Sequence, residues 1–154
     1  MGAKVKNPRK KFLWSIMFPK HPINTYLFQS CTLPDIEIDQ VAHGDVNRDV
    51  KTAGRVTVGN LIVEKLMTTA GSDTWLHDWL YACQDHIVGG GLVPSQYWET
   101  AIVNELAEDG VSVLNTHVFE EVWPCKITGL DLDRMASENT IESIEFSVGT
   151  ADKY

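Results

Sequence analysis

The 154-residue sequence lacks most of the features by which enzymes and membrane proteins are recognised. It has no G-x-S-x-G, G-x-x-x-x-G-K-[ST] or H-E-x-x-H motif, which argues against the hydrolase, phosphate-loop and zinc-helix sites that carry them. No apolar run approaches the roughly 20 residues of a membrane-spanning helix. The cysteines at 31, 83 and 125 are too few for a disulfide framework and favour a reducing compartment. We therefore expect no cofactor, no metal and no membrane contact.

Two groups of side chains offer weak signals for chemistry. His77, Cys83 and His86 are close enough in sequence to share a metal, but no second Cys/His pair completes a tetrahedral site. Glu37 and Asp39 lie on one face of a predicted strand, about 6.6–6.8 Å apart at 3.3–3.4 Å per residue, a separation that suits acid–base chemistry. Because their neighbours also read as solvent-facing, a solvated acidic face is the favoured interpretation, and a small carboxylate hydrolase is the alternative.

Acidic residues are absent from the first 34 positions, which hold six of the 13 lysines and arginines. The other seven basic residues and all 21 acidic residues follow, so residues 35–154 carry a net charge of −14. This predicts a basic arm at residues 1–11 that is either solvated or docked on an acidic surface, of its own chain or of another copy. A body so acidic repels phosphate groups and argues against tight binding of nucleic acid.

Alternation of apolar and polar residues predicts a mainly β chain. At 35–39 acidic residues alternate with isoleucine, which predicts a strand with one buried face, formed by the isoleucines, and one wet, negatively charged face. At 140–148 Ile144, Phe146 and Val148 share one face while Ser143, Glu145 and Ser147 share the other. Asp109-Gly110 predicts a tight hairpin. The other predicted strands are 12–18, 26–33, 55–67, 98–107 and 111–119, with a short apolar element at 123–130.

Only one helix is predicted. It begins at Ser72 or Asp73, carries apolar residues at spacings of three and four as far as Ile87, and ends at the glycines 89–91. Residues 43–54 have no periodicity and mixed charge, so we expect a long loop that makes contacts. The fold class that follows is an antiparallel β-sandwich or barrel with one packed α-helix, formed by residues 12–154 as a single domain.

Several segments, in order along residues 12–148, resemble the tail tube proteins of contractile-tailed bacteriophages and, more distantly, the tube component of type VI secretion systems. Residues 54–62, GRVTVGNLI, resemble the family passage G-R-x-x-x-G-N-I. The segment 123–132, WPCKITGLDL, resembles W-x-x-x-K-x-x-G-x-x-L, and 137–146, SENTIESIEF, resembles the final strand of the family. The tryptophan-rich helix lies between these segments, as it does in the family.

The resemblance implies a structural role and not an enzyme. Copies would form hexameric rings that stack into a hollow conduit for genome delivery, with strands joining an inter-subunit barrel and residues 43–54 reaching the adjacent ring. The implied partners are further copies, the tail sheath protein, the tape measure protein, the baseplate hub and the tail terminator. Viral DNA would pass through without specific binding, in a virion tail made in the host bacterial cytoplasm.

We expect two sets of site residues. Glu37, Asp39 and Glu105 are the candidates for an acidic lumen wall, which would let DNA slide because it repels phosphate. The candidates for subunit contacts are Lys10, Lys11, Arg48, Asp49, Lys51 and Arg55. Two other roles stay open: the tube of a type VI-like secretion or contractile injection system, and a monomeric module that binds ligands on its tryptophans.

Overall fold

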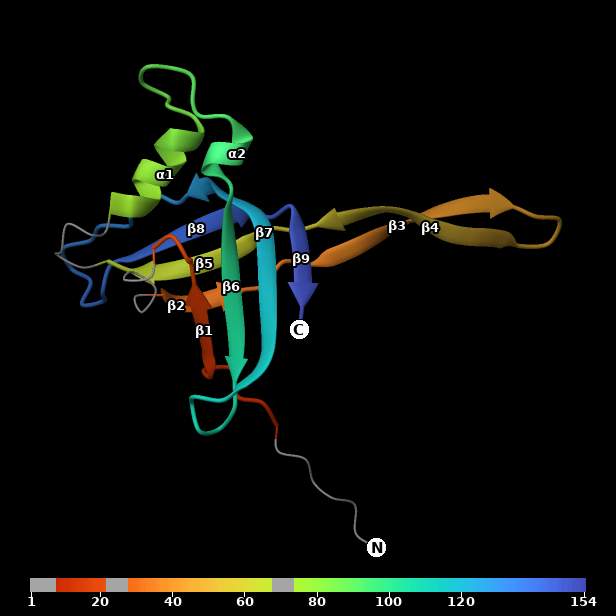
Figure 1. Cartoon of the computed structure of the whole chain (residues 1–154), viewed down its shortest axis with the longest axis horizontal. Helices are drawn as coiled ribbons and strands as arrows, with labels where there is room; N and C mark the ends of the chain where they lie inside the picture. Colours follow the sequence, from red (N-terminus) through yellow and green to blue (C-terminus); the bar gives the residue numbers. More distant parts are fainter. Residues whose placement is uncertain (1–7, 22–27, 68–73) are drawn as a thin grey trace, which may run out of the picture.

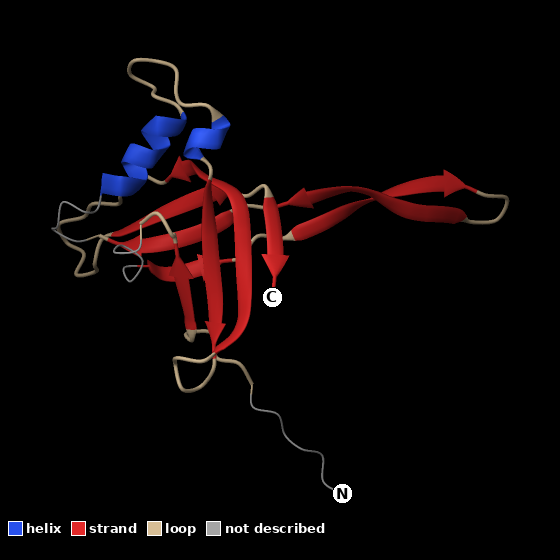
Figure 2. Ribbon diagram, in the orientation of Figure 1, coloured by secondary structure: helices blue, strands red, loops and turns tan. Residues whose placement is uncertain are grey.

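The computed structural model describes residues 8–21, 28–67 and 74–154 of the chain. They form a β-rich body with a helix on one side and a long two-stranded hairpin that projects from it (Figures 1 and 2). The hairpin consists of β3 (Ile36–Gly44) and β4 (Asp49–Val58). The body strands are β1 (Trp14–Met17), β2 (Phe28–Thr32), β5 (Leu61–Leu66), β6 (Glu99–Leu106), β7 (Val113–Ile127), β8 (Ile141–Ser147) and β9 (Thr150–Lys153).

The body is one folded sheet with the order β1-β6-β7-β8-β5-β2, and β9 pairs with β7. Every pair in it is antiparallel, which confirms the predicted fold class. The sheet folds into two layers, one with β1, β6, β7 and β9 and the other with β8, β5 and β2. The long strand β7 belongs to both layers, because it pairs with β9 up to Glu120 and with β8 from Trp123 onward. Glu121 has a left-handed backbone (φ 56°) at this corner. The β6–β7 register shifts here, between Glu99–Val122 and Ala101–Phe119, so β7 contains a bulge, which bends the strand and lets the sheet fold onto itself.

The core lies between the two layers, under helix α1 (Trp75–Cys83). Phe18 is fully buried, with its ring centroid 5.7 Å from that of Trp75 and 5.3 Å from that of Phe146. The predicted inner face of 140–148 is confirmed, because Ile144, Phe146 and Val148 are all buried. Each such side chain stabilises the fold by about 1.5–3 kcal/mol.

The helix is shorter than predicted. Gln84 has an extended backbone (φ −158°), so α1 ends at Cys83, and the prediction that it runs to Ile87 and ends at the glycines 89–91 is wrong. The predicted caps Ser72 and Asp73 lie outside the described residues. A second helix that was not predicted, α2 (Pro94–Tyr97), follows before β6.

Residues 43–54 are not the irregular loop that the sequence predicts. They form the outer part of the β3–β4 hairpin, with a turn closed by the bond from the Asp45 amide to the Arg48 carbonyl (2.9 Å). The prediction failed because both faces of this hairpin are exposed in the single chain, so no buried side imposes a period of two. The strand predicted at 55–67 is likewise two strands, β4 and β5, separated at Gly59-Asn60.

Candidate assembly surfaces

The root of the hairpin has one apolar and one acidic face. Ile36 pairs with Val58 and Ile38 pairs with Val56 on one face, while Glu37 pairs with Thr57 on the other. The predicted strand at 35–39 is confirmed, but the predicted burial of its isoleucines is wrong: Ile36 is 60% and Ile38 53% exposed. No part of the described chain covers them. Glu37 and Asp39 are therefore held together on a projecting ribbon, both exposed.

The acidic face of the root continues onto the body. Val58, which shares its face with Ile36, packs against the core, so the face of Glu37 continues the outer side of the β2-β5-β8 layer. On that side Glu64 lies opposite Ser143, and Glu145 lies opposite Ile62. Lys126 lies opposite Glu145 in the β7–β8 register, so this side also carries one positive charge. Glu64 and Glu145 were not predicted as part of an acidic face, although the alternation in 140–148 already placed Glu145 on a polar face.

Glu105 is not part of this face. It lies on β6, where its Oε2 accepts hydrogen bonds from Arg9 Nη1 (2.6 Å) and Asn115 Nδ2 (2.8 Å), with His117 Nε2 at 3.7 Å. Partial burial acts to raise the pKa of Glu105, but the Asn115 hydrogen bond and the positive charges of Arg9, His117 and Lys153 outweigh it and lower the pKa. The carboxylate is thus neutralised by its own chain.

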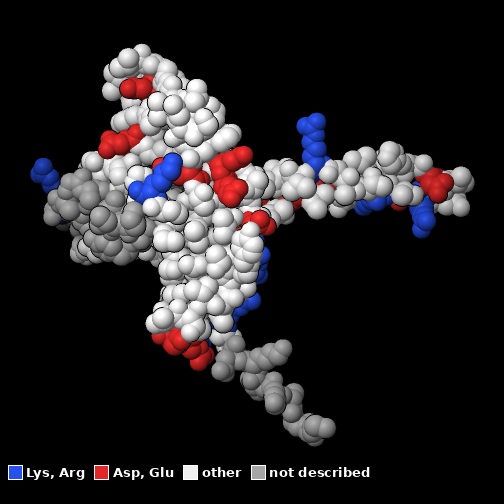
Figure 3. Space-filling model, in the orientation of Figure 1, with Lys and Arg blue, Asp and Glu red and all other residues white. Residues whose placement is uncertain are grey.

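The structure divides the predicted contact residues between two places. Arg48 lies in the hairpin turn, and Asp49, Lys51 and Arg55 follow on β4, all exposed. Figure 3 shows charged side chains of both signs along the hairpin. Lys10 and Lys11 lie elsewhere, at the end of the arm next to β1, where they line a hollow with Trp14 and Leu33. The basic arm contacts its own body through the Arg9–Glu105 ion pair.

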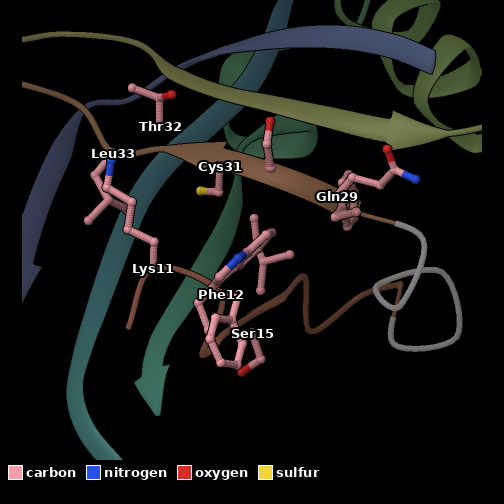
Figure 4. A pocket seen from close by; sticks show the side chains of 11 residues that line it. Lys11, Phe12, Ser15, Gln29, Cys31, Thr32 and Leu33 are labelled. Atoms are coloured by element: carbon pink, nitrogen blue, oxygen red, sulfur yellow. The ribbon is translucent and has the colours of Figure 1, made fainter. Parts of the chain in front are cut away.

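A hollow of about 1010 Å³ separates β1 from β2 (Figure 4). Within the described part of the chain these strands are the two ends of the sheet, and each has one edge with no partner strand. Cys31 lines the hollow, and burial raises the pKa of its thiol to about 12, which makes it a poor nucleophile at neutral pH. The unpaired edges of β1 and β2 are the feature of this hollow that suits binding to another chain.

The other residues singled out by their chemistry have structural partners. His77 Nε2 lies 3.2 Å from Glu142 Oε2, and Cys83 is buried on α1. Residues 8–21, 28–67 and 74–154 contain no group of three side chains arranged to hold a metal ion. Trp75 and Trp79 are buried in the core and are not exposed platforms for a ligand. None of the helices in the described ranges is long and apolar enough to cross a membrane.

Comparisons with known proteins cover the hairpin and the body together. Residues 10–150 match the family model described as "T4-like virus tail tube protein gp19". The curated "Tail tube protein gp19" of Enterobacteria phage T4 is 27% identical over 127 residues, which cover 80% of this chain and 77% of that protein.

Solved structures share the fold. The tube-terminating cap of the anti-feeding prophage superposes with a TM-score of 0.82 at 16% identity, covering 100% of this chain and 95% of that chain. A chain of the sheath–tube complex of the extracellular contractile injection system PVC gives 0.78 at 18% identity, covering 97% and 93%. A type six secretion system protein is more distant, with a TM-score of 0.55 at 12% identity and coverage of 91% and 81%.

Proposed function

The chain belongs to the T4-like virus tail tube protein gp19 family, and on this premise we propose that six copies close a ring and that rings stack into a hollow tube. As a member of the family, the chain is a structural tail tube protein of a contractile, phage-like system. The observation that carries the proposal is the hairpin β3–β4, a ribbon of 19 strand residues with nearly every side chain exposed. An isolated two-stranded hairpin is only marginally stable in water, so another molecule has to cover it.

The open edges of β1 and β2 support the same proposal. An unpaired edge is a template for further strands, and closure between subunits removes it. In the proposed tube, strands of neighbouring copies pair at these edges into an inter-subunit barrel. The outer part of the hairpin, residues 43–54, reaches the adjacent ring, with Arg48, Asp49, Lys51 and Arg55 in that contact and Lys10 and Lys11 in a separate one. Residues 1–11 remain proposed as a basic arm and 12–154 as the tube domain.

The face of Glu37 and Asp39 is the proposed lumen wall. Glu64 and Glu145 extend it over the body, between hydroxyl side chains such as Ser143. A negative wall with neutral polar groups between the charges repels phosphate, so DNA passes without binding. Glu105, which we first assigned to the wall, is a weaker candidate because Arg9 already neutralises it.

The proposed partners follow from the family and from the assemblies that contain chains of this fold. They are a sheath protein, a tape measure protein, a baseplate hub and a terminator at the end of the tube, in a virion tail made in the host cytoplasm. A second candidate function is the tube of a contractile injection system that carries a protein cargo. The specific observation in its favour is the high structural similarity, with TM-scores of 0.82 and 0.78, to chains of two such systems.

The hydrolase alternative has no support in the family, whose members are structural. It would also require Glu37 and Asp39 to work on a projecting ribbon, where both are exposed. A general acid needs an environment that keeps it protonated near neutral pH, usually through burial.

Electron microscopy of the concentrated protein tests the proposal directly. We expect hollow six-fold rings and tubes in negative stain, and deletion of residues 43–54 is expected to leave rings that do not stack. A wild-type protein that stays monomeric at every salt and protein concentration would contradict the proposed function. In assembled tubes, the combined variant Glu37→Gln, Asp39→Asn, Glu64→Gln and Glu145→Gln is expected to retain DNA in the lumen, whereas Glu120→Gln, on the other layer, is the control.

A further inference from the structure

The apolar side chains of the hairpin change faces halfway along it. At the root, Ile36, Ile38 and Val56 share one face of the ladder and are 60%, 53% and 59% exposed. This face is continuous with the interior of the body, because Val58 on the same face packs against the core. The hydrophobic core therefore extends beyond the body as an uncovered apolar surface, which we call the root face.

A bulge separates the root from the tip. Between the pairs Ile38–Val56 and Gln40–Ala53, strand β4 contains one extra residue. A side chain at Gly54 would place its Cβ 3.0 Å from the carbonyl oxygen of Asp39, so a glycine suits this close approach. Bulges increase the local twist of a ribbon, and in Figure 2 the two strands wind about each other midway along the hairpin.

At the tip the apolar residues lie on the opposite face. Val41 pairs with Thr52 and Val50 pairs with His43, on the face that carries Glu37 at the root. Val41 and Val50 are 42% and 41% exposed. The face that was apolar at the root now carries the Ala42–Lys51 and Gly44–Asp49 pairs. The bulge and its twist thus separate the two apolar sets along the ribbon, and the hairpin presents two distinct apolar surfaces, one at the root and one at the tip.

The body carries a surface that matches the root face. On the outer side of the β1-β6-β7 layer, Met17, Ile102 and Val118 lie side by side in register. The next row consists of Ser15, Asn104 and Thr116, in which the Thr116 hydroxyl donates to Asn104 Oδ1 (3.0 Å). These six residues, the neutral strip, carry no charge, and Asp152 borders them beside Val118. Met17 is 40% exposed.

We propose that the root face of one copy binds the neutral strip of a second copy within a ring, while Val41 and Val50 at the tip contact a third copy in the next ring. The proposal rests on the proposed function. In this contact the apolar side chains of the root face meet those of the neutral strip with no charged group between them. The second copy thereby covers the apolar surface that extends outward from Val58. The acidic face of the root stays uncovered, as a lumen wall requires.

Separate variants of root and tip test the two contacts. The root variant Ile36→Thr, Ile38→Thr, Val56→Thr keeps β-branched side chains and is expected to abolish ring formation, leaving monomers in sedimentation. The tip variant Val41→Thr, Val50→Thr is expected to give rings that do not stack. Thr57→Ser, on the opposite face of the root, is the control and should assemble like wild type. Because all five substituted residues are exposed, circular dichroism should report an unchanged monomer fold.

Cross-linking identifies the surface that the root meets. In a Cys125→Ser background, Ile38→Cys with Ile102→Cys is expected to give a ladder of disulfide-linked oligomers from oxidised tubes, whereas Ile38→Cys with Ile62→Cys should stay unlinked. Tubes that form normally from the root variant, or that show no ladder for the first pair, would overturn this inference and leave the proposed function intact. A wild-type protein that never assembles would overturn both.

Discussion

Nε2 of His77 lies 3.2 Å from Oε2 of Glu142, so helix α1 is joined to strand β8 through a carboxylate that is only 1% exposed. Lys65, fully buried, is the partner of Glu142 in the β5–β8 register. Two oppositely charged residues therefore lie side by side beneath the helix, in a core that is otherwise apolar and aromatic. Buried charges of this kind are costly to desolvate, and removing one partner is more damaging than removing both.

Glu142→Leu is expected to lower the free energy of unfolding by about 1–3 kcal/mol, because it removes the acceptor of the His77 contact and the negative charge that lies opposite Lys65 in the register. The double variant Lys65→Met, Glu142→Leu should recover part of that loss, which urea denaturation at pH 7 can measure. His77→Ala is the comparison, and it should cost about 1 kcal/mol or less because its side chain is partly exposed. A double variant as unstable as the sum of the two single variants would show that the residues do not interact.

Trp79→Phe is expected to destabilise the monomer by about 1–2 kcal/mol. Nε1 of Trp79 donates to the carbonyl of Tyr97 (2.8 Å), and phenylalanine leaves that oxygen without its donor. Trp75→Phe is the matched control, since Nε1 of Trp75 has no acceptor within the described residues although it is buried in the same core. Thermal denaturation of both variants tests this, and equal losses would show that packing alone accounts for the effect.

The turn between β6 and β7 is expected to stay intact to unusually low pH. The Ser112 hydroxyl donates to Asp109 (2.6 Å), as do the amides of Val111 and Ser112 (2.9 Å each), and these bonds lower the pKa of Asp109 from 3.8 to about 2. A depressed pKa means that Asp109 contributes stability fully above pH 3.8 and loses it as the pH falls towards 2.

NMR titration of the Asp109 carboxyl group should therefore give a midpoint near pH 2. Asp109→Asn retains an acceptor oxygen but does not titrate. The part of the pH dependence of the unfolding free energy that Asp109 causes between pH 3.8 and 2 should therefore disappear in this variant. Glu108→Gln, the preceding residue, serves as the control. A midpoint at the ordinary value would show that the three hydrogen bonds do not persist in solution.

The sequence was most informative where a single chain buries one side of a strand. Ile144, Phe146 and Val148 alternate with polar residues because one face meets the core, and their face was predicted correctly. The end of α1 was missed because Ile87 continues the helical spacing although it is 80% exposed beyond the last turn. The periodicity of a sequence shows which positions are apolar. When copies of a chain assemble, some of these positions are buried between copies and stay exposed in the single chain.

The hairpin illustrates this limit for the site. Ile38 and Val41 lie on opposite faces because they are three positions apart on β3, and the bulge opposite Asp39 separates a root and a tip with different surroundings. No single period describes such a ribbon, which is why residues 43–54 read as a loop. The position of Glu37 and Asp39 on the same face of one strand was predictable from alternation alone. The neutralisation of Glu105 was not, since Arg9 is 96 residues away in sequence.

Removal of residues 1–11 is expected to weaken the assembly in a salt-dependent way while leaving the monomer nearly unchanged. The Arg9–Glu105 pair is exposed, with 56% and 32% of the two side chains accessible, so its loss should cost the monomer less than about 1 kcal/mol. The removed segment carries five basic residues and no acidic one, so in the tube it is attracted to an acidic assembly, and screening reduces this attraction as ionic strength rises. Sedimentation of wild-type and truncated tubes from 20 mM to 500 mM salt (about 20 Å to about 4 Å of screening length) tests this.

The difference in sedimented fraction between wild-type and truncated protein should be largest at low salt and should vanish at high salt. The variant Lys10→Gln, Lys11→Gln should reproduce part of it, and equal sedimentation at every salt concentration would exclude a role for the arm in cohesion.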